Sequence, residues 1–419
     1  MQHVELSKVP TLAVLVLFLS AFPSLLAQEA QLEIRNPEQG AAVRVLRTHT
    51  INVSGDSHVF GRSGFDLLVI SPGTFDRTTL SERGTLAAIR GQRIQTLQGP
   101  WSISLTGVEP RATLGDRDPF VVITSSASGG YGSEIIRAMP LSDMLDGKSE
   151  AVARLLPTGF RSPLLVRSGI RLVATGYGYE PKTPNAVAML PREGKEDSQN
   201  LTLYDMAGGT PIMLGIIEHF SEHAENNLAS GSTRDGVIHM IATEVLVSQG
   251  NRARVHHLRF DPAKRQWLGD SIIFDRSQFT SMITPRLVTA ENIVDAFWLP
   301  EGGSEKLSTD GLYARRIGEP STWRLTDSRG EYSILPNADG HGSLLVGVAI
   351  HPSEDGKIRW FIRRGEHWKA AGETDLARTV YTLSIDGTEP FALWRDPGGG
   401  VHAAFVAETG LIVADLQIP

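Results

Sequence analysis

Short runs of apolar residues, many alternating with polar ones, recur along most of the chain. The runs have the length of β-strands and are bounded by Gly, Pro, Asp and Asn, which favour turns. Long helical periodicity is scarce, so we expect an all-β protein built as a sandwich, barrel or propeller. The clearest runs are Thr50–Val53, Phe65–Ile70, Trp101–Leu105, Phe120–Thr124, Arg171–Thr175, Val237–Thr243, Val294–Trp298, Leu344–Val348, Lys357–Ile362 and Val401–Val406.

An internal repeat makes the propeller the favoured architecture. Five segments share an apolar strand, a Gly/Asp/Asn turn and a second apolar strand, and these second strands recur 51 to 67 residues apart. The second strands begin at Arg171, Ile238, Val294, Leu345 and Val401. Third strands are expected at Ala186–Leu190, Val255–Phe260, Leu312–Arg316, Ile358–Arg363 and Leu411–Leu416. A repeated unit of this size is typical of a propeller blade, which buries its faces only against neighbouring blades.

Three units also carry a tryptophan at matching places, and we expect these to pack between blades. They are Trp267, Trp323 and Trp368. Gly311–Arg316 followed by Ser321–Trp323 resembles a blade of the sialidase-like (BNR-type) β-propeller superfamily. Phe160–Pro163 resembles the Arg-Ile-Pro opening of that family, although Ser162 replaces Ile and no complete Asp-box is present. The resemblance implies a propeller over residues 158–419, in which Arg161 would grip a substrate carboxylate.

The organisation of the chain depends on how residues 28–128 are interpreted. We favour a small β-sandwich there, similar to a bacterial immunoglobulin-like domain, followed by a propeller over residues 129–419. Glu134–Leu141 would then close a ring of five blades, because an open sheet edge is a liability. If the runs near Phe120 and Phe65 belong to further blades, the count becomes six or seven.

Residues 1–27 have the features of a secretory signal peptide. His3 and Lys8 precede the apolar run Leu12–Phe22, and Ala27 offers a small residue at the expected cut. The run is short for a membrane span, which needs about 20 apolar residues. We therefore expect a mature chain without a membrane span, secreted or periplasmic.

Composition removes several classes of function. The chain has no cysteine, which excludes disulfides, cysteine zinc sites and cysteine nucleophiles. Its formal net charge is −7 and it has no basic block, which argues against nucleic acid as a partner.

The candidate chemistry lies at one end of the expected propeller. Loops that join one blade to the next, and the second strand of a blade to its third, meet at this loop-bearing end, where function is normally found. An arginine can bind a carboxylate through two hydrogen bonds, and two carboxylates can act as acid and base on a glycosidic bond. The candidate ligand-binding residues are Arg161, Tyr177, Tyr179, His223 and Tyr332, and the candidate catalytic residues are Glu222, Glu331 and Glu389.

Two features of these candidates limit the chemistry. Glu331 and Tyr332 are adjacent, so in a strand they point to opposite faces and do not form a pair. His219 and His223 belong to a His-x-x-Glu-His sequence, which binds zinc in inverzincin peptidases when it lies on a helix. Here Ile212–Ile217 predicts a strand, so we expect at most simple metal binding by His219 and His223. The sequence indicates no cofactor beyond Zn²⁺ or Ca²⁺ at such positions.

Three hypotheses for the function follow. The first is an exported propeller that binds a glycan or another extracellular ligand at the loop-bearing end of its central channel. The second is an exo-acting, sialidase-like glycoside hydrolase, and the third is an envelope or protein-interaction scaffold. We expect a monomer whose partner is an extracellular glycan or protein. Whether the chain is an enzyme stays open, because a fold does not fix a function.

Overall fold

The computed structural model describes most of the chain from residue 33 to the C-terminus. The described residues are 33–51, 58–60, 67–76, 81–90, 93–98, 102–104, 120–126, 134–140, 143, 154–155, 161–178, 187–192, 198–208, 210–222, 228–250, 252–276, 283–300, 310–350, 354–375, 391–396, 398–407 and 410–419. The expected signal peptide, residues 1–27, lies outside this part of the chain. Among the described residues, no helix is long and apolar enough to cross a membrane.

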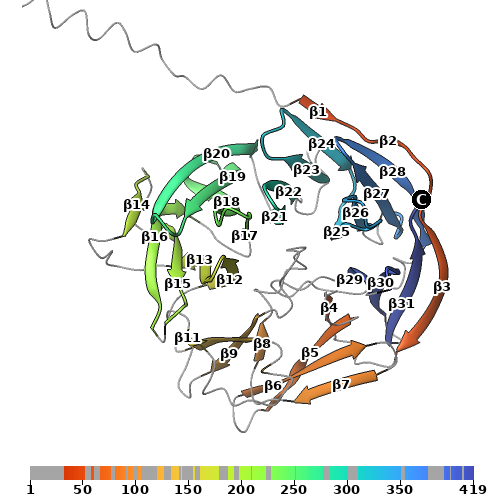
Figure 1. The fold of residues 1–419 in the computed structure, drawn as a ribbon, viewed down its shortest axis with the longest axis horizontal. Coiled ribbons are helices and arrows are strands. Elements are labelled where there is room, and N and C mark those ends of the chain that lie inside the picture. The colour runs from red at the N-terminus through yellow and green to blue at the C-terminus, as the bar shows by residue number, and fades with distance from the viewer. Residues whose placement is uncertain are drawn as a thin grey trace, which may run out of the picture.

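The described strands form seven sheets arranged as a ring (Figure 1), which we number as blades 1 to 7 in chain order. Blade 1 contains β4 (His58–Phe60), β5 (Leu67–Asp76), β6 (Ser81–Arg90) and β7 (Arg93–Gln98). Blade 2 contains β8 (Ser102–Ser104), β9 (Phe120–Ser126), β10 (Glu134–Pro140) and β11 (Arg154–Leu155). Blade 3 contains β12 (Arg161–Ser168), β13 (Arg171–Gly178), β15 (Gln199–Asp205), β16 (Ile212–Ser221) and the outer β14 (Ala188–Leu190). Blade 4 contains β17 (Leu228–Ser232), β18 (Ile238–Leu246), β19 (Arg252–Asp261) and β20 (Gln266–Arg276).

The remaining blades recruit strands from the start of the chain. Blade 5 contains β21 (Ile283–Ala290), β22 (Ile293–Pro300), β23 (Leu312–Arg316) and β24 (Ser321–Thr326), with β1 (Glu33–Arg35) on its outer edge. Blade 6 contains β25 (Gly330–Pro336), β26 (Leu344–Ile350), β27 (Ile358–Arg364) and β28 (His367–Thr374), with β2 (Glu38–Gln39) outside. Blade 7 contains β29 (Phe391–Arg395), β30 (Val401–Ala407), β31 (Gly410–Gln417) and β3 (Arg44–Ile51).

The first four strands of each blade are paired antiparallel, from an inner strand that faces the ring axis to an outer one. The inner strands β12, β17 and β21 contact one another in turn, and β29 contacts both β25 and β4. In blades 3 to 7 the turns between first and second strands are short, as at Gly236 and Gly340, whose φ angles of +84° and +80° suit glycine. The connections from second to third strands, and from one blade to the next, lie at the opposite end of the ring, which is the loop-bearing end. The protein is a β-propeller, as the repeat predicts.

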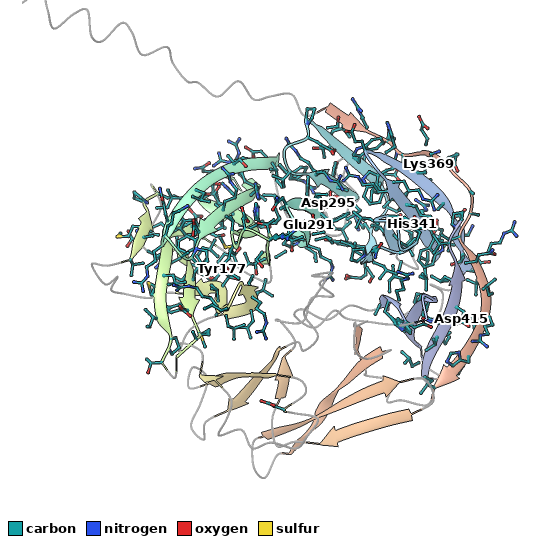
Figure 2. The ribbon with its side chains drawn as sticks, in the orientation of Figure 1. Tyr177, Glu291, Asp295, His341, Lys369 and Asp415 are labelled. Atoms are coloured by element: carbon teal, nitrogen blue, oxygen red, sulfur yellow. The ribbon has the colours of Figure 1, made fainter. Side chains whose placement is uncertain are left out.

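The core lies between the faces of neighbouring blades, as the stacking of blades requires. One apolar cluster joins each pair of neighbours from blade 3 to blade 7. Trp368 is 1% exposed and Trp323 is 6% exposed, and Trp267 packs edge-on against Phe260. The predicted packing role of the three tryptophans is thus confirmed. Figure 2 draws the described side chains as sticks and labels Asp295, which joins blades 5 and 6.

The sheets correct three details of the sequence analysis. The ring has seven described blades, the largest count left open rather than the favoured five, and the strands described between residues 33 and 126 belong to blades, which was the alternative to a sandwich. Glu134–Pro140 pairs with β9 and β11 inside blade 2, and β3 closes blade 7 in its place. The third strand of blade 3 is Gln199–Asp205, because Ala188–Leu190 forms the extra outer strand β14.

Candidate functional site

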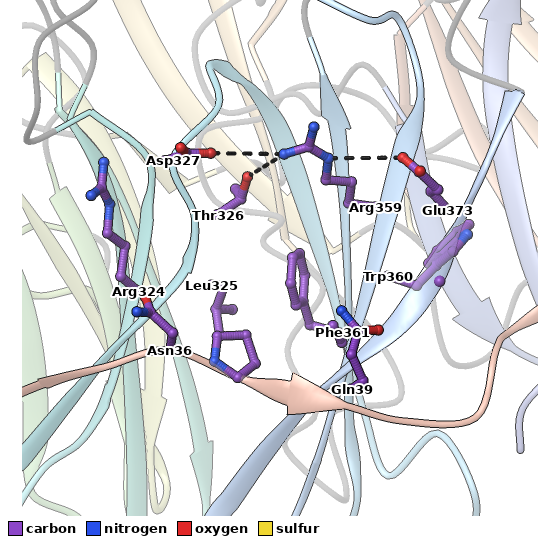
Figure 3. A pocket seen from close by; sticks show the side chains of 13 residues that line it. Asn36, Gln39, Arg324, Leu325, Thr326, Asp327, Arg359, Trp360, Phe361 and Glu373 are labelled. Atoms are coloured by element: carbon purple, nitrogen blue, oxygen red, sulfur yellow. Dashed lines mark hydrogen bonds and ion pairs between the residues drawn. The ribbon is translucent and has the colours of Figure 1, made fainter.

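A pocket opens between blades 5 and 6 at the loop-bearing end (Figure 3). It lies where β24 and β28 end and where β27 begins. Its volume is about 580 Å³, within the range of ligand sites in proteins. The lining residues are Asn36, Pro37, Gln39, Arg324, Leu325, Thr326, Asp327, Arg359, Trp360, Phe361, Ala370, Gly372 and Glu373.

The outer wall of the pocket comes from the start of the chain. Residues 33–43, which we call the strap, run along the outer strands of two blades. Ile34 pairs with Thr322 of β24, and Gln39 pairs with Ala370 of β28, both in parallel register. The strap therefore bridges the gap between the two blades and carries Asn36 and Gln39 to the pocket (Figure 3).

Arg359 is the central charge of the pocket. Its Nη1 donates to Thr326 Oγ1 at 3.1 Å and to Ser328 Oγ at 2.8 Å. Its Nη2 donates to Asp355 Oδ2 at 2.7 Å. Asp327 and Glu373 lie on either side of the guanidinium, at 3.9 and 4.0 Å (Figure 3). These contacts fix the guanidinium between two exposed carboxylates.

The remaining lining gives the pocket a second charged wall and an apolar floor. Arg324 lines it from β24, and its Nη2 donates to the backbone carbonyl of Asp310 at 2.5 Å. Leu325 and Phe361 contribute apolar surface and are both buried at 4% exposure. The pocket thus combines cations, carboxylates and side-chain amides over apolar carbon.

The structure places both described tyrosine candidates inside the wall of the ring. Tyr177 has no exposed surface, its hydroxyl donates to the Thr243 carbonyl of blade 4 at 3.4 Å, and burial raises its pKa. Tyr332 is equally buried and donates to the Thr284 carbonyl of blade 5 at 2.9 Å. Each tyrosine therefore joins its blade to a neighbour, which leaves it no surface for a ligand.

The two described carboxylate candidates lie three blades apart. Glu222, just after β16, accepts the backbone N–H of Ser248 at 2.7 Å and also the Ser248 hydroxyl. It therefore ties the blade-connecting loop to the loop after β18. Glu331 lies on β25, the inner strand of blade 6, where its backbone is paired with Ala349. The fold does not bring the two together.

Other candidates are described in part or not at all. Arg161 begins β12, where it pairs with Tyr177, but its side chain lies outside the described residues, as do Tyr179, His223 and Glu389. His219 lies on strand β16, so the helix that the zinc pattern needs is not formed there. No group of three or more His, Asp or Glu side chains in the described part of the chain could hold a metal ion.

The sequence analysis missed Arg324 and Arg359. They lie on outer and third strands of neighbouring blades, where a basic residue in a strand usually indicates only an exposed face. The one available signal was the pair of loops around them, at 327–333 and 351–356, which the repeat places at the loop-bearing end.

No family model and no curated protein matches this chain. Among solved structures, it is similar to a protein of unknown function from Dyadobacter fermentans DSM 18053, with 15% identity, a TM-score of 0.42 and coverage of 90% of this chain and 100% of that one. It is also similar to the β-propeller domain of the Trilobed protease from Pyrococcus furiosus, with 8% identity, a TM-score of 0.41 and coverage of 74% and 81%. A third is an α-L-arabinofuranosidase from Fusarium graminearum, with 10% identity, a TM-score of 0.37 and coverage of 92% and 97%.

Proposed function

We propose that this propeller binds a glycan in the pocket between blades 5 and 6. The observation that carries the proposal is the convergence of Arg324, Arg359, Asp327, Glu373 and two side-chain amides on one cavity of about 580 Å³. We also propose that the chain is exported, on the basis of residues 1–27. The similarity of its blades to those of sialidases is part of the same proposal.

Sugar hydroxyls both donate and accept hydrogen bonds, so a glycan needs donors and acceptors side by side. Arginine and amide N–H groups supply the donors, while carboxylate and amide oxygens supply the acceptors. The apolar faces of a sugar ring can contact carbon surface such as Phe361. A site of this kind holds its ligand by several hydrogen bonds over a small apolar floor.

Binding rather than hydrolysis is the better fit to the described residues. A glycosidase needs two carboxyl groups free to flank the scissile bond. In the pocket, Arg359 stands between Asp327 and Glu373. Outside the pocket, the carboxylate of the candidate Glu222 accepts a hydrogen bond from the backbone N–H of Ser248. We therefore assign retention of the ligand, without bond cleavage, as the function.

The test is a glycan array probed with the labelled mature chain, residues 28–419, followed by calorimetric titration of any hit. Arg359→Gln should weaken binding by about tenfold or more, since a charge-assisted hydrogen bond contributes about 1.5–3 kcal/mol. Arg234→Gln, on an exposed turn of blade 4, is the matched control and should bind normally.

Two results would count against the proposal. One is the absence of any retained glycan. The other is release of reducing sugar from a retained one, which would make the protein a hydrolase. In that case Asp327→Asn and Glu373→Gln would identify the carboxylate responsible.

A further inference from the structure

Three arginines from three blades surround one aspartate beside the pocket. Arg276 ends β20 of blade 4, Arg324 lies on β24 of blade 5, and Arg329 precedes β25 of blade 6. Asp310, just before β23, lies between them. The ends of these strands all face the loop-bearing end, which is why residues far apart in sequence meet here.

Each arginine contacts Asp310 in a different way. Arg276 Nη1 lies 3.3 Å from Asp310 Oδ1, and Arg329 Nε lies 3.5 Å from Oδ2. Arg324 instead donates to the Asp310 backbone carbonyl. The Arg276 side chain is 4% exposed and that of Asp310 is not exposed at all. The cluster is thus largely removed from water.

Two guanidinium N–H groups of the cluster are buried without an acceptor among the described residues. Arg276 Nη2 and Arg324 Nε are buried, and neither has a hydrogen-bond partner in the described part of the structure. The exposed Glu354, just outside the cluster, accepts the Arg329 backbone N–H at 3.2 Å. Buried guanidinium groups are normally paired, because an unpaired buried charge is costly.

We propose that this cluster binds an oxyanion, either a carboxylate or a sulfate. Arg276 Nη2 and Arg324 Nε would donate to it, and the planar guanidinium suits both anions. Arg324 also lines the pocket, so the anion is reached from there. This second step rests on the proposed function: if the pocket binds a glycan, that glycan is acidic, a uronic acid or a sulfated sugar.

The first measurement titrates the mature chain with sodium sulfate at millimolar concentration, against sodium chloride at equal ionic strength, by calorimetry and thermal unfolding. Saturable sulfate binding is expected, weakened about tenfold or more in Arg276→Gln. Arg171→Gln, whose partner is Asp205 in blade 3, is the matched control and should bind like the wild type. If Arg276→Gln does not fold by circular dichroism, the more exposed Arg324→Gln replaces it.

The second measurement compares glucuronic acid with glucose. Tighter binding of the acid, lost in Arg276→Gln, identifies a sugar carboxylate as the ligand group. If sulfate binds but no glycan on the array is retained, the anion site is supported and the proposed glycan binding is contradicted. Absence of saturable binding of both anions to the wild type, or equal binding by Arg276→Gln, would overturn the anion site even if neutral glycans bind.

Discussion

At the scale of single residues, Asp295 joins two blades through their charges. Arg316 of its own blade donates to both carboxylate oxygens at 3.0 Å. Arg363 of blade 6 donates to Oδ1 at 2.5 Å and also to both oxygens of Glu319, at 3.0 and 3.1 Å. The side chains of Asp295 and Arg363 are 5% and 3% exposed. Removing the charge of Asp295 therefore leaves the buried Arg363 with Glu319 as its carboxylate partner.

We expect Asp295→Asn to lower the free energy of unfolding by about 1.5–3 kcal/mol, the usual contribution of a hydrogen bond to a charged group. The matched control is Asp327→Asn, whose side chain is 65% exposed and lies 3.9 Å from Arg359. It should cost less than about 1 kcal/mol. Urea unfolding of the three proteins measures both values. Equal losses in the two variants would show that the network contributes no more than a surface pair.

At the scale of elements, the register of β18 and β19 places two histidines together. His239 lies opposite Arg259 and His257 opposite Ile241, so the histidines are diagonal neighbours on one face. Their rings stack at 5.2 Å, with His239 Nδ1 2.9 Å from His257 Nε2. Burial is the main cause that lowers the pKa of His239 to about 4 and that of His257 to about 3. The charge of Asp235 raises the pKa of His239 and that of Asp270 raises the pKa of His257, so both oppose burial. The charge of Arg259 lowers both pKa values further.

This pair predicts a loss of stability in mild acid. In the unfolded chain each histidine takes up a proton near pH 6.5, whereas the folded pair stays neutral until about pH 4. Stability should therefore fall as the pH drops from 6.5 to 4, by roughly 1.4 kcal/mol per pH unit for each histidine. Urea unfolding at pH 7, 6 and 5 should show a shallower pH dependence in His239→Gln/His257→Gln. The exposed His341→Gln should keep the slope of the wild type, and an unchanged slope in the double variant would contradict the argument.

The elements also show what the sequence can predict. Second strands at Ile238, Val294, Leu345 and Val401 were predicted correctly, because each follows a turn that leaves a local signal. Blade 3 was misassigned, since Ala188–Leu190 is as apolar as a third strand and only its parallel pairing with β16 reveals its place. His256 and His257 are adjacent on β19, and alternation along a strand predicts that they face opposite sides. They do: His256 contacts Glu244 and Asp270, and His257 contacts His239.

At the scale of the whole molecule, the pairing of strands that lie far apart in the chain could not be predicted from the sequence. Nothing in Arg44–Ile51 indicates that it pairs with Gly410–Gln417, at the other end of the chain. The pocket could not be predicted for the same reason, because it forms only where the strap meets the ends of strands from two blades. Glu222 was predicted at the correct end of the ring, but its engagement by Ser248 depends on how two loops fold together.

The closure of the ring by β3 is itself open to test. Without β3, the outer strand β31 of blade 7 loses its ladder partner from Arg44↔Gln417 to Ile51↔Leu411 and becomes an open edge. We expect a chain that begins at residue 52 to aggregate or to unfold at a lower temperature than one that begins at residue 42, which lacks β1 and β2 but keeps β3.

Size-exclusion chromatography and thermal circular dichroism measure the difference between the two truncated chains. A synthetic peptide of residues 42–51 should raise the unfolding temperature of the shorter chain by adding a strand to the free edge, as in donor-strand complementation. A peptide of the same composition in scrambled order is the control, because it lacks the alternation that places side chains on the correct faces. If the shorter chain is monomeric and melts at the same temperature as the longer one, the ring does not depend on β3 for its closure. The seventh blade would then be stable with three strands.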